Sequence, residues 1–391
     1  MVTSPQKNIV RLDELDMKFA EAVANAGGEK INLCLQCGTC SASCPFGRIT
    51  PFQIRQLIRR AQLGFRDKVL SNKDLWLCTT CYTCAHRCPR DANPMEILIG
   101  LRSLVVEEGV VPRTLGDAME GVYKYGNPWG LSRGKRSDWA QDLKVKHASE
   151  GEKVELLYFV GCAASYDSRA QEVARAMVKN LNALSVDFSI LGNKETCCGN
   201  EIYSLGEKGL FEELVDKNLG LFDYYGINNI VTTSPHCYNS FKNRYGRELL
   251  VEHYTQHFAN LVDEGKLNFS GKIEKVVTYQ DPCFLGRHNN IYEEPRKIIE
   301  SIPGLRFVEL SRSRKRSVCC EGGGGRMWYD VTREWERLAE TRVSEALDIG
   351  AEIMAVACPF CLLTFDDAIK TTGNEDKIQV KDIMELVTEA L

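Results

Sequence analysis

The sequence has 391 residues, 44% hydrophobic and 26% charged, which is typical of a soluble globular protein with two or three domains. Its formal net charge of −4 argues against a nucleic-acid partner, and no apolar run reaches the roughly 18–20 residues that span a bilayer. The first twenty residues lack the apolar core of a signal peptide. We therefore expect a cytoplasmic protein, associated with a membrane only through partners.

The N-terminal segment 1–30 is predicted to be helical and to end at Gly27 and Gly28. Four of its apolar residues share one face of a helix with the usual period, namely Leu12, Leu15, Phe19 and Val23. The segment 106–152 is polar and rich in turn residues, and is predicted to be a linker.

Cysteine is unusually frequent, with 17 residues, and the cysteines occur in clusters. In a chain without a predicted signal peptide, clustering favours metal ligation over disulfide bonds. Eight of them lie in segment 31–105, in two groups separated by a helix-patterned stretch, Phe52 to Leu63. Each group has the spacing C-x2-C-x2-C-x3-C-P of bacterial ferredoxins. The groups are Cys34, Cys37, Cys40 and Cys44, and Cys78, Cys81, Cys84 and Cys88.

This spacing predicts two cubane [4Fe–4S] clusters in a ferredoxin-like domain. Three closely spaced cysteines wrap one cluster, and the fourth, before proline, reaches the other. One cluster is therefore assigned Cys34, Cys37, Cys40 and Cys88, and the other Cys78, Cys81, Cys84 and Cys44. Zinc is the alternative, but zinc sites typically use cysteine pairs rather than a triplet and a fourth residue.

From residue 153 onward, short apolar runs alternate with helical patterns, which predicts an α/β fold. Four of these runs are predicted strands with a cysteine at or near the C-terminal end, where open α/β sheets place their ligand sites. They are Val154–Val160, Ile230–Thr233, Lys275–Tyr279 and Ile353–Ala357.

The same half contains an internal repeat, predicted as two domains, 153–270 and 271–391. Cys162 is followed after 34 residues by Cys197 and Cys198, and after 38 more by Cys237. In the second copy the intervals are 35 and 37 residues, and the cysteines are Cys283, Cys319, Cys320, Cys358 and Cys361. Ser234 occupies the position that corresponds to Cys358.

These motifs resemble the cysteine-rich CCG domains of heterodisulfide reductases and their relatives. The N-terminal CLQCGTCSASCP and DLWLCTTCYTCAHRCPR resemble the C subunit, and the remainder resembles the B subunit, so the chain looks like the fused D subunit. The stretches TTSPHCYNSFKNRYG, DPCFLGRHNNIYEEPRKI, CCEGGGGRMW and ACPFC also resemble iron–sulfur subunits of electron-transfer-flavoprotein oxidoreductases and of glycolate and glycerol-3-phosphate dehydrogenases.

The resemblance implies a noncubane [4Fe–4S] cluster, as the candidate catalytic centre, on the complete five-cysteine motif. In the first motif Ser234 replaces the fifth ligand, and the hydroxyl of serine ionises far less readily than a thiol. A cubane cluster, another metal centre or no metal are the alternatives for that site. A second departure is Glu321, where the motif usually has the glycine that names the domain; Gly322–Gly325 keep the loop supple.

The resemblance further implies an oxidoreductase subunit of a multi-subunit, anaerobic redox complex. Its partner would be a flavin-containing A-type subunit, since no flavin or nicotinamide motif is present. Electrons would pass through two cubane clusters to the noncubane site, for thiol/disulfide chemistry or exchange with a partner. Because one site is degenerate, we do not expect a true methanogenic reductase. The alternative is a pure electron-transfer subunit that feeds a quinone or flavin dehydrogenase.

Asp281 and His236 are the candidates for proton delivery near a cluster, with a loop-structuring role as the alternative. Basic residues before Cys319 form either an anion-attracting surface or a solvated loop. They are Arg312, Arg314, Lys315 and Arg316.

Overall fold

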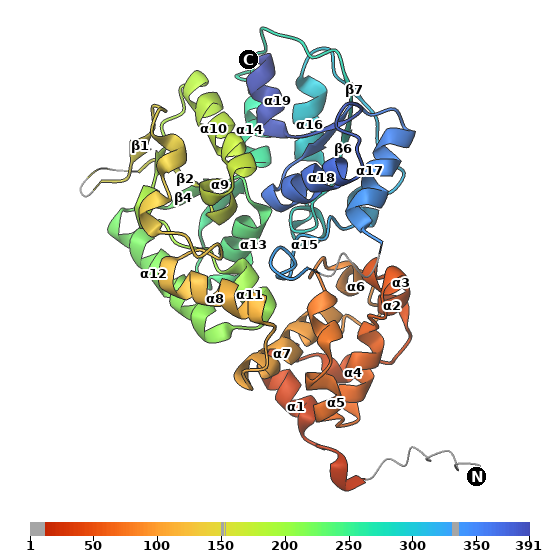
Figure 1. Ribbon diagram of the computed structural model, residues 1–391. Helices are drawn as coiled ribbons and strands as arrows, with labels where there is room; N and C mark the ends of the chain where they lie inside the picture. The colour runs from red at the N-terminus through yellow and green to blue at the C-terminus, as the bar shows by residue number, and fades with distance from the viewer. Residues whose placement is uncertain (1–11, 150–151, 153, 331–335) are drawn as a thin grey trace. The chain divides into compact units, whose positions relative to one another are not determined.

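The computed structural model describes residues 12–149, 152, 154–330 and 336–391. The chain divides into two compact units, which are described separately (Figure 1). The first unit comprises Met1–Cys78 and Thr83–Val111, and the second comprises Thr79–Tyr82 and Pro112–Leu391. The loop from Cys78 to Cys84 is therefore divided between the two units.

The first unit is helical within its described residues. Its α-helices are α1 (Phe19–Val23), α2 (Thr39–Ser43), α3 (Phe46–Ile49), α4 (Ile54–Gln62), α5 (Arg66–Leu70), α6 (Thr83–His86) and α7 (Pro94–Glu107). Helix α7 is apolar along most of its length and packs against α1, α4 and α5. Helix α4 confirms the helix-patterned stretch between the two cysteine groups.

The prediction for the N-terminal helix is only partly correct. A short 3₁₀ turn, Leu12–Glu14, precedes α1, and Leu12 is 82% exposed, so this residue does not share a buried face with Phe19 and Val23. The helical backbone ends at Gly27, whose φ of 100° lies in the left-handed region, as the glycine pair predicted. The earlier residues of the predicted helix, 1–11, lie outside the described residues.

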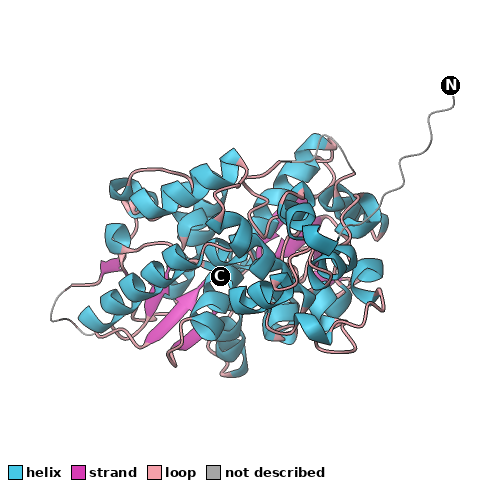
Figure 2. Cartoon of the chain, turned by 90° about the horizontal axis from the view of Figure 1, so that it is seen from below, coloured by secondary structure: helices cyan, strands magenta, loops and turns pink. Residues whose placement is uncertain are grey.

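The second unit contains two parallel β-sheets of matching topology, flanked by helices (Figure 2). The first sheet has the strand order β1-β3-β2-β4-β5. Its strands are β1 (Lys146–His147), β2 (Leu157–Phe159), β3 (Ser189–Ile190), β4 (Asn229–Thr232) and β5 (Leu250–His253). The second sheet has the strand order β7-β6-β8-β9. Its strands are β6 (Val276–Tyr279), β7 (Arg306–Phe307), β8 (Ile353–Val356) and β9 (Gln379–Asp382).

Apart from β1, each strand of the first sheet has a counterpart in the second, which confirms the repeat at the level of topology. The four predicted cysteine-delivering strands are β2, β4, β6 and β8. In each sheet the chain leaves the first strand on one side and returns on the other, so the strand order reverses between β2 and β4, and between β6 and β8. Ligand sites of open α/β sheets lie at this reversal point.

Helices on the two sheets complete the second unit, and the sequence patterns between strands account for most of them. They are α8 (Arg113–Tyr125), α9 (Cys162–Tyr166), α10 (Ser168–Ala183), α11 (Asn200–Leu205), α12 (Lys208–Tyr224), α13 (Pro235–Arg244), α14 (Tyr254–Asp263), α15 (Gly286–Asn289), α16 (Glu293–Ser301), α17 (Leu338–Asp348), α18 (Pro359–Thr371) and α19 (Ile383–Ala390). Helix α8 lies in the segment predicted to be a linker, 106–152, which is therefore not simply an irregular connection.

Two equivalent pairs of helices pack across the two repeats. Helix α10 of the first repeat contacts α19 of the second, and α14 of the first contacts α16 of the second. The α10–α19 contact includes an ion pair from Arg169 to Glu385, at 2.8 Å, and a hydrogen bond from the Asn180 amide to the Met384 carbonyl, at 2.9 Å. Each helix after a first strand thus meets the last helix of the other repeat.

Candidate iron–sulfur centres

The two ferredoxin-type loops share an unusual backbone conformation. Residues two positions after the first cysteine have positive φ in both loops, 61° at Gln36 and 52° at Thr80. Residues directly after the second cysteine do likewise, with φ of 86° at Gly38 and 67° at Tyr82. Such turns point successive backbone N–H groups toward one side, as a loop that surrounds a sulfide-rich cluster requires. The sequence spacing and the local backbone therefore agree.

The remaining cysteines of these motifs lie on or beside short helices. Cys40 is on α2 and Cys84 on α6, and these two helices pack together within the first unit. Cys44 ends α2, and the sulfur of Cys88 accepts a hydrogen bond from the backbone N–H of Ala92 at 3.3 Å. The crossed assignment of Cys44 and Cys88 stays a prediction.

The complete cysteine-rich motif brings its five cysteines together at the C-terminal ends of β6 and β8. All five are buried: Cys283, Cys319, Cys320, Cys358 and Cys361. The Cys319 thiol contacts those of Cys283 and Cys320, while Cys361 contacts those of Cys320 and Cys358. The five sulfurs thus form a continuous row, with the Cys319–Cys320 pair joining cysteines that come from different strands.

The second ferredoxin-type loop reaches this five-cysteine row within the second unit. The hydroxyl of Thr79 lies 3.2 Å from the sulfur of Cys319, and the Cys81 thiol also contacts Cys319. The approach is close enough to require glycine at position 323, because a Cβ there would lie 2.7 Å from the carbonyl oxygen of Thr79.

Arg287, on α15, stabilises the same contact between the second ferredoxin-type loop and the five-cysteine row. Its guanidinium is buried and donates to the carbonyl oxygens of Cys81 and Ser317, both at 2.7 Å. His288 adds a hydrogen bond to the Thr80 carbonyl at 2.9 Å, and its ring stacks on Phe284. Burial lowers the pKa of His288 to about 3, so the ring is neutral at pH 7. The arginine supplies positive charge beside sulfur ligands that are anionic when they bind metal.

The first cysteine-rich motif brings its four cysteines together in the same way, at the ends of β2 and β4. The Cys197 thiol contacts those of Cys162 and Cys198, and the Cys198 thiol contacts that of Cys237. Gly161, with φ of 78°, is required here, since a Cβ would lie 3.2 Å from the sulfur of Cys237. The row of sulfurs in the first motif therefore has four members, one fewer than the row in the second motif.

Ser234 takes the position of the missing sulfur and has a structural task. It is the N-cap of α13, and its hydroxyl oxygen accepts a hydrogen bond from the backbone N–H of Cys237 at 3.4 Å. Cys358 holds the equivalent N-cap position of α18 without such a side-chain bond. The serine thus retains a helix cap where the second repeat has a predicted sulfur ligand.

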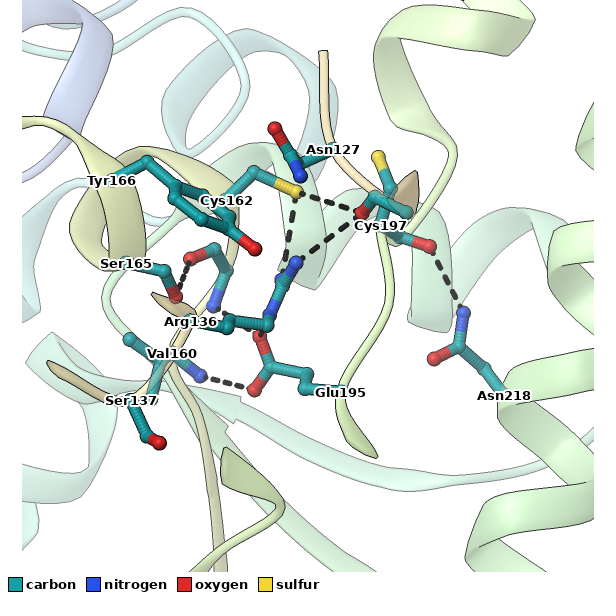
Figure 3. A network of polar contacts seen from close by, with 12 residues as sticks. Asn127, Arg136, Ser137, Val160, Cys162, Ser165, Tyr166, Glu195, Cys197 and Asn218 are labelled. Carbon is teal, nitrogen blue, oxygen red and sulfur yellow. Dashed lines mark hydrogen bonds and ion pairs between the residues drawn. The ribbon is translucent and has the colours of Figure 1, made fainter. Parts of the chain in front are cut away.

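A buried arginine lies beside the first motif and was not anticipated from the sequence (Figure 3). The Arg136 guanidinium lies 3.5 Å from the sulfur of Cys162 and forms a 2.7 Å ion pair with Glu195. Both side chains of the pair are 1% exposed. The Glu195 carboxylate also accepts backbone hydrogen bonds from Val160 and Gly161, both at 2.9 Å. Arg136 comes from the segment predicted as a linker, where no local pattern marks it.

The electrostatics of this arginine favour its charged form. Burial disfavours the charge, but the attraction of Cys162 and Glu195 outweighs burial and raises the pKa of Arg136. A buried guanidinium therefore lies near each cysteine-rich motif, Arg136 at the first and Arg287 at the second.

His236 links the two motifs. Its Nδ1 lies 2.8 Å from the Glu201 carboxylate, and the ring contacts the thiol of Cys358 in the other repeat. Glu201 in turn accepts a hydrogen bond from the backbone N–H of Gly325 at 2.9 Å. The ring also packs against Phe284 and Phe360. This candidate for proton delivery thus contacts a predicted sulfur ligand and a buried carboxylate.

Asp281, the other candidate, is held in a structural ion pair. Its carboxylate forms two hydrogen bonds with Arg296, at 2.8 and 2.9 Å, and accepts the backbone N–H of Arg314 at 2.6 Å. Of the basic residues before Cys319, Arg314 pairs with Glu293 and Arg312 with Glu345. Much of that positive charge is therefore neutralised locally.

Glu321 has the backbone conformation of the glycine that it replaces. Its φ is 78°, against 79° at Gly199 in the first repeat. Its carboxylate accepts the backbone N–H of Leu338 at 2.6 Å, at the start of α17, and lies 3.7 Å from Arg337. Burial raises the pKa of Glu321 to about 7. A side-chain role at the helix terminus thus accompanies an unfavourable backbone conformation.

The donor set suits iron–sulfur clusters. All 17 cysteines are free thiols, and the first sulfur of each Cys-Cys pair accepts a backbone N–H at 3.4 Å, from Gly199 to Cys197 and from Glu321 to Cys319. No three His, Cys, Asp or Glu side chains within the described ranges converge on one point as ligands of a single ion would. Rows of thiolates that address several irons are the arrangement that a cluster requires.

Comparison with known proteins supports this chemistry. Residues 156–242 and 277–366 match the family described as the cysteine-rich domain CCG, and residues 30–92 match the 4Fe-4S dicluster domain. No described helix has the combination of length and apolar composition that a membrane crossing needs.

Several curated proteins are similar over most of this chain. A probable iron–sulfur-binding oxidoreductase of Bacillus subtilis is 37% identical, and the EtfAB:quinone oxidoreductase of Syntrophomonas wolfei is 33% identical, each over 83% of this chain. The chain spans 47% of the length of both.

A third relative matches from end to end. The D subunit of the dihydromethanophenazine:CoB–CoM heterodisulfide reductase of Methanosarcina barkeri is 31% identical over 93% of this chain and 94% of its own length. The two domain types, their order along the chain and this match over full length agree. The chain belongs to the iron–sulfur oxidoreductases related to the D subunit of heterodisulfide reductase.

Proposed function

We propose that the chain is the electron-transfer subunit of a multi-subunit redox complex, with two cubane clusters and a noncubane cluster on the complete cysteine-rich motif. Iron–sulfur clusters supply one-electron transfer at potentials that their surroundings adjust. The ferredoxin-type cysteines would hold the cubane clusters. The five-cysteine row from Cys283 to Cys361 would hold the terminal cluster.

The contact of Cys81 and Thr79 with Cys319 is the observation that carries this proposal. A residue assigned to the second cubane cluster thereby adjoins a ligand of the proposed terminal cluster. Arg287 fixes this contact through the backbone of Cys81. Electrons would thus pass from the second ferredoxin-type loop to the five-cysteine row without crossing the first motif.

The cavity beside the first motif favours electron transfer over turnover of a disulfide. It has a volume of about 50 Å³ and is bounded by Cys162, Trp129, Trp328 and Phe360, among other residues. Small-molecule sites typically enclose about 300–1,000 Å³. A space of this size admits water but not a substituted disulfide, so we propose that a partner subunit is the acceptor.

Similarity suggests the type of partner. One relative is named EtfAB:quinone oxidoreductase, and by analogy we propose a flavoprotein as the donor and a quinone-reactive module as the acceptor. The flavin-containing A-type subunit of heterodisulfide reductases is the alternative donor.

Iron analysis and redox assays of the anaerobically purified chain test the proposal. We expect about 12 irons per chain, or about 16 if the first motif also binds a cluster, at four irons for each cluster. Reduced chain should be reoxidised rapidly by a quinone-reactive partner and should not turn over with thiol-derived disulfides. A content of only eight irons per chain would show that the terminal cluster is absent. Sustained disulfide reduction would show that the chain is a catalyst rather than an electron-transfer subunit.

A further inference from the structure

A stretch of the first unit is strongly basic although the chain as a whole is acidic. Between Lys30 and Arg66 there are six lysine and arginine residues and no aspartate or glutamate, in a chain of net charge −4. The same stretch includes the whole of the first ferredoxin-type motif and helix α4.

The cations inside this stretch form no ion pair with the part of the chain that the structure describes. Lys30 and Arg66, at its two ends, pair with Asp91 and Glu108 respectively. In contrast, no ion pair with any described residue is found for the four arginines between them, which are Arg48, Arg55, Arg59 and Arg60. Arg48 and Arg59 are exposed. Their charge is therefore available to a molecule outside the unit.

These arginines border the most accessible cysteine of the chain. Cys37 is exposed, whereas every other cysteine is half-buried or buried. It lines an open groove of about 690 Å³ together with Arg48 and Arg55. Arg55 lies over the adjacent Gly38, with its Cδ 3.7 Å from the position of a Cβ there. Positive charge thus lies directly beside a predicted cluster ligand.

Two further features indicate a docking surface. Leu35, between the first two cysteines of the motif, is 67% exposed and provides an apolar contact. Arg55 and Arg59 lie one turn apart on α4, so the two positive charges lie on the same side of the helix.

We propose that this surface, defined by Leu35, Cys37, Arg48, Arg55 and Arg59, docks an acidic electron-carrier protein that reduces the first cubane cluster. Opposite charge accelerates association and orients the partner, and apolar contact at the centre is typical of such interfaces. In the step itself the reduced carrier loses one electron and the oxidised cluster gains it, and no bond is made or broken. The inference rests on the proposed function and adds the place and charge of the donor.

The test uses the full chain, and a reduced bacterial-type ferredoxin with an acidic surface serves as the probe. We expect the second-order rate constant for cluster reduction to fall steeply as salt increases, because screening weakens the attraction. Arg55→Glu and Arg59→Glu should each lower the low-salt rate constant about fivefold or more and flatten the salt dependence.

Arg113→Glu is the matched control. Arg113 has a 93% exposed side chain on α8, in the other unit, so its reversal makes the same change in net charge outside the surface. Iron content and complete reduction by dithionite, measured on every variant, report separately on the proposed clusters. A control that slows as much as Arg55→Glu, or a rate independent of salt, overturns the docking surface. Salt-sensitive binding of anionic phospholipid vesicles, without effect of the variants on the ferredoxin rate, assigns the surface to a membrane and also overturns it.

Discussion

Single charged residues distinguish the two cysteine-rich motifs more clearly than the cysteines do. The first motif has a buried Arg136–Glu195 pair against Cys162, and the second has Glu321 in a glycine conformation beside Cys320. A buried charge is tolerated only with a partner, and a left-handed residue other than glycine is disfavoured. Each feature therefore leads to a measurable consequence.

Replacing Arg136 by methionine should be strongly destabilising. The change leaves Glu195 buried without its cation, and breaking such a pair costs about 3–5 kcal/mol. The measurement is denaturant unfolding under anaerobic conditions. Arg136→Met combined with Glu195→Gln should recover part of the loss, because the unpaired charge is then removed.

Arg175→Met is the control for this experiment. Arg175 pairs with Asp142, which is 65% exposed, so its loss should cost no more than about 1 kcal/mol. Equal effects at positions 136 and 175 would contradict the importance of the buried pair.

Two substitutions at position 321 separate the backbone from the side chain. Glu321→Ala loses the hydrogen bond to Leu338 and keeps the strained backbone, whereas Glu321→Gly loses the same bond and removes the strain. We expect the glycine variant to be more stable than the alanine variant by about 1 kcal/mol. Unfolding temperatures at one fixed scan rate measure the order. An alanine variant as stable as the glycine variant would show that the conformation carries no penalty.

At the scale of elements, corresponding helix caps differ between the repeats. His253 ends β5 and caps α14, and Asp382 ends β9 and caps α19, each in a capping box. The Tyr254 hydroxyl donates to Asp382 at 2.8 Å, so the two caps also meet across the repeat boundary. Among the described residues, the second carboxylate oxygen of Asp382 is buried without a hydrogen-bond partner.

This environment predicts a pH dependence of stability. Burial raises the pKa of Asp382 to about 8, and the negative charge of Glu385 acts in the same direction. The hydrogen bonds from the Met384 backbone N–H and the Tyr254 hydroxyl, and the positive charge of Arg169, only partly oppose this rise. The folded chain then holds a proton that the unfolded chain releases near pH 4, so this group makes stability fall from about pH 4 to about pH 8. The slope reaches about 1.4 kcal/mol per pH unit. Asp382→Asn should abolish this component, which differential unfolding at pH 6, 7 and 8 measures.

His253→Asn provides the comparison. Burial lowers the pKa of His253 to about 3, so this residue makes stability rise with pH up to about pH 7.5 and contributes little slope above it, the opposite sign to Asp382. A stability gain of Asp382→Asn over wild type that does not grow between pH 6 and 8 would contradict the raised pKa.

The elements also show what the sequence can predict. The strands that deliver cysteines and the repeat were predictable, because cysteine spacing and apolar runs are local patterns. The N-terminal helix was overextended to Leu12, since four residues with helical spacing do not establish a buried face. Arg136 was missed because its partners, Glu195 and Cys162, lie far along the chain and only folding brings them together.

For the whole molecule, the two cysteine-rich repeats have the same topology but different connections. Within the second unit, the second repeat contacts the ferredoxin-type loop through Cys319, Arg287 and His288. The serine substitution and the 50 Å³ cavity lie at the first motif. From this asymmetry we expect the second motif to carry electrons and the first motif to have a structural role. Equivalent substitutions in the two motifs should therefore have unequal effects on electron transfer.

Cys320→Ser and its equivalent, Cys198→Ser, test that asymmetry. The Cys320 thiol contacts both Cys319 and Cys361, so its loss should remove the proposed terminal cluster, about four irons per chain, while dithionite still reduces the two proposed cubane clusters. Electron delivery to an acceptor should then stop, because the cubane clusters no longer have an exit. Cys198→Ser should leave delivery largely intact, since the first motif lies off the proposed route. Loss of delivery in Cys198→Ser with full activity in Cys320→Ser would reverse the roles of the two repeats, and would place the exit at the motif that contains Ser234.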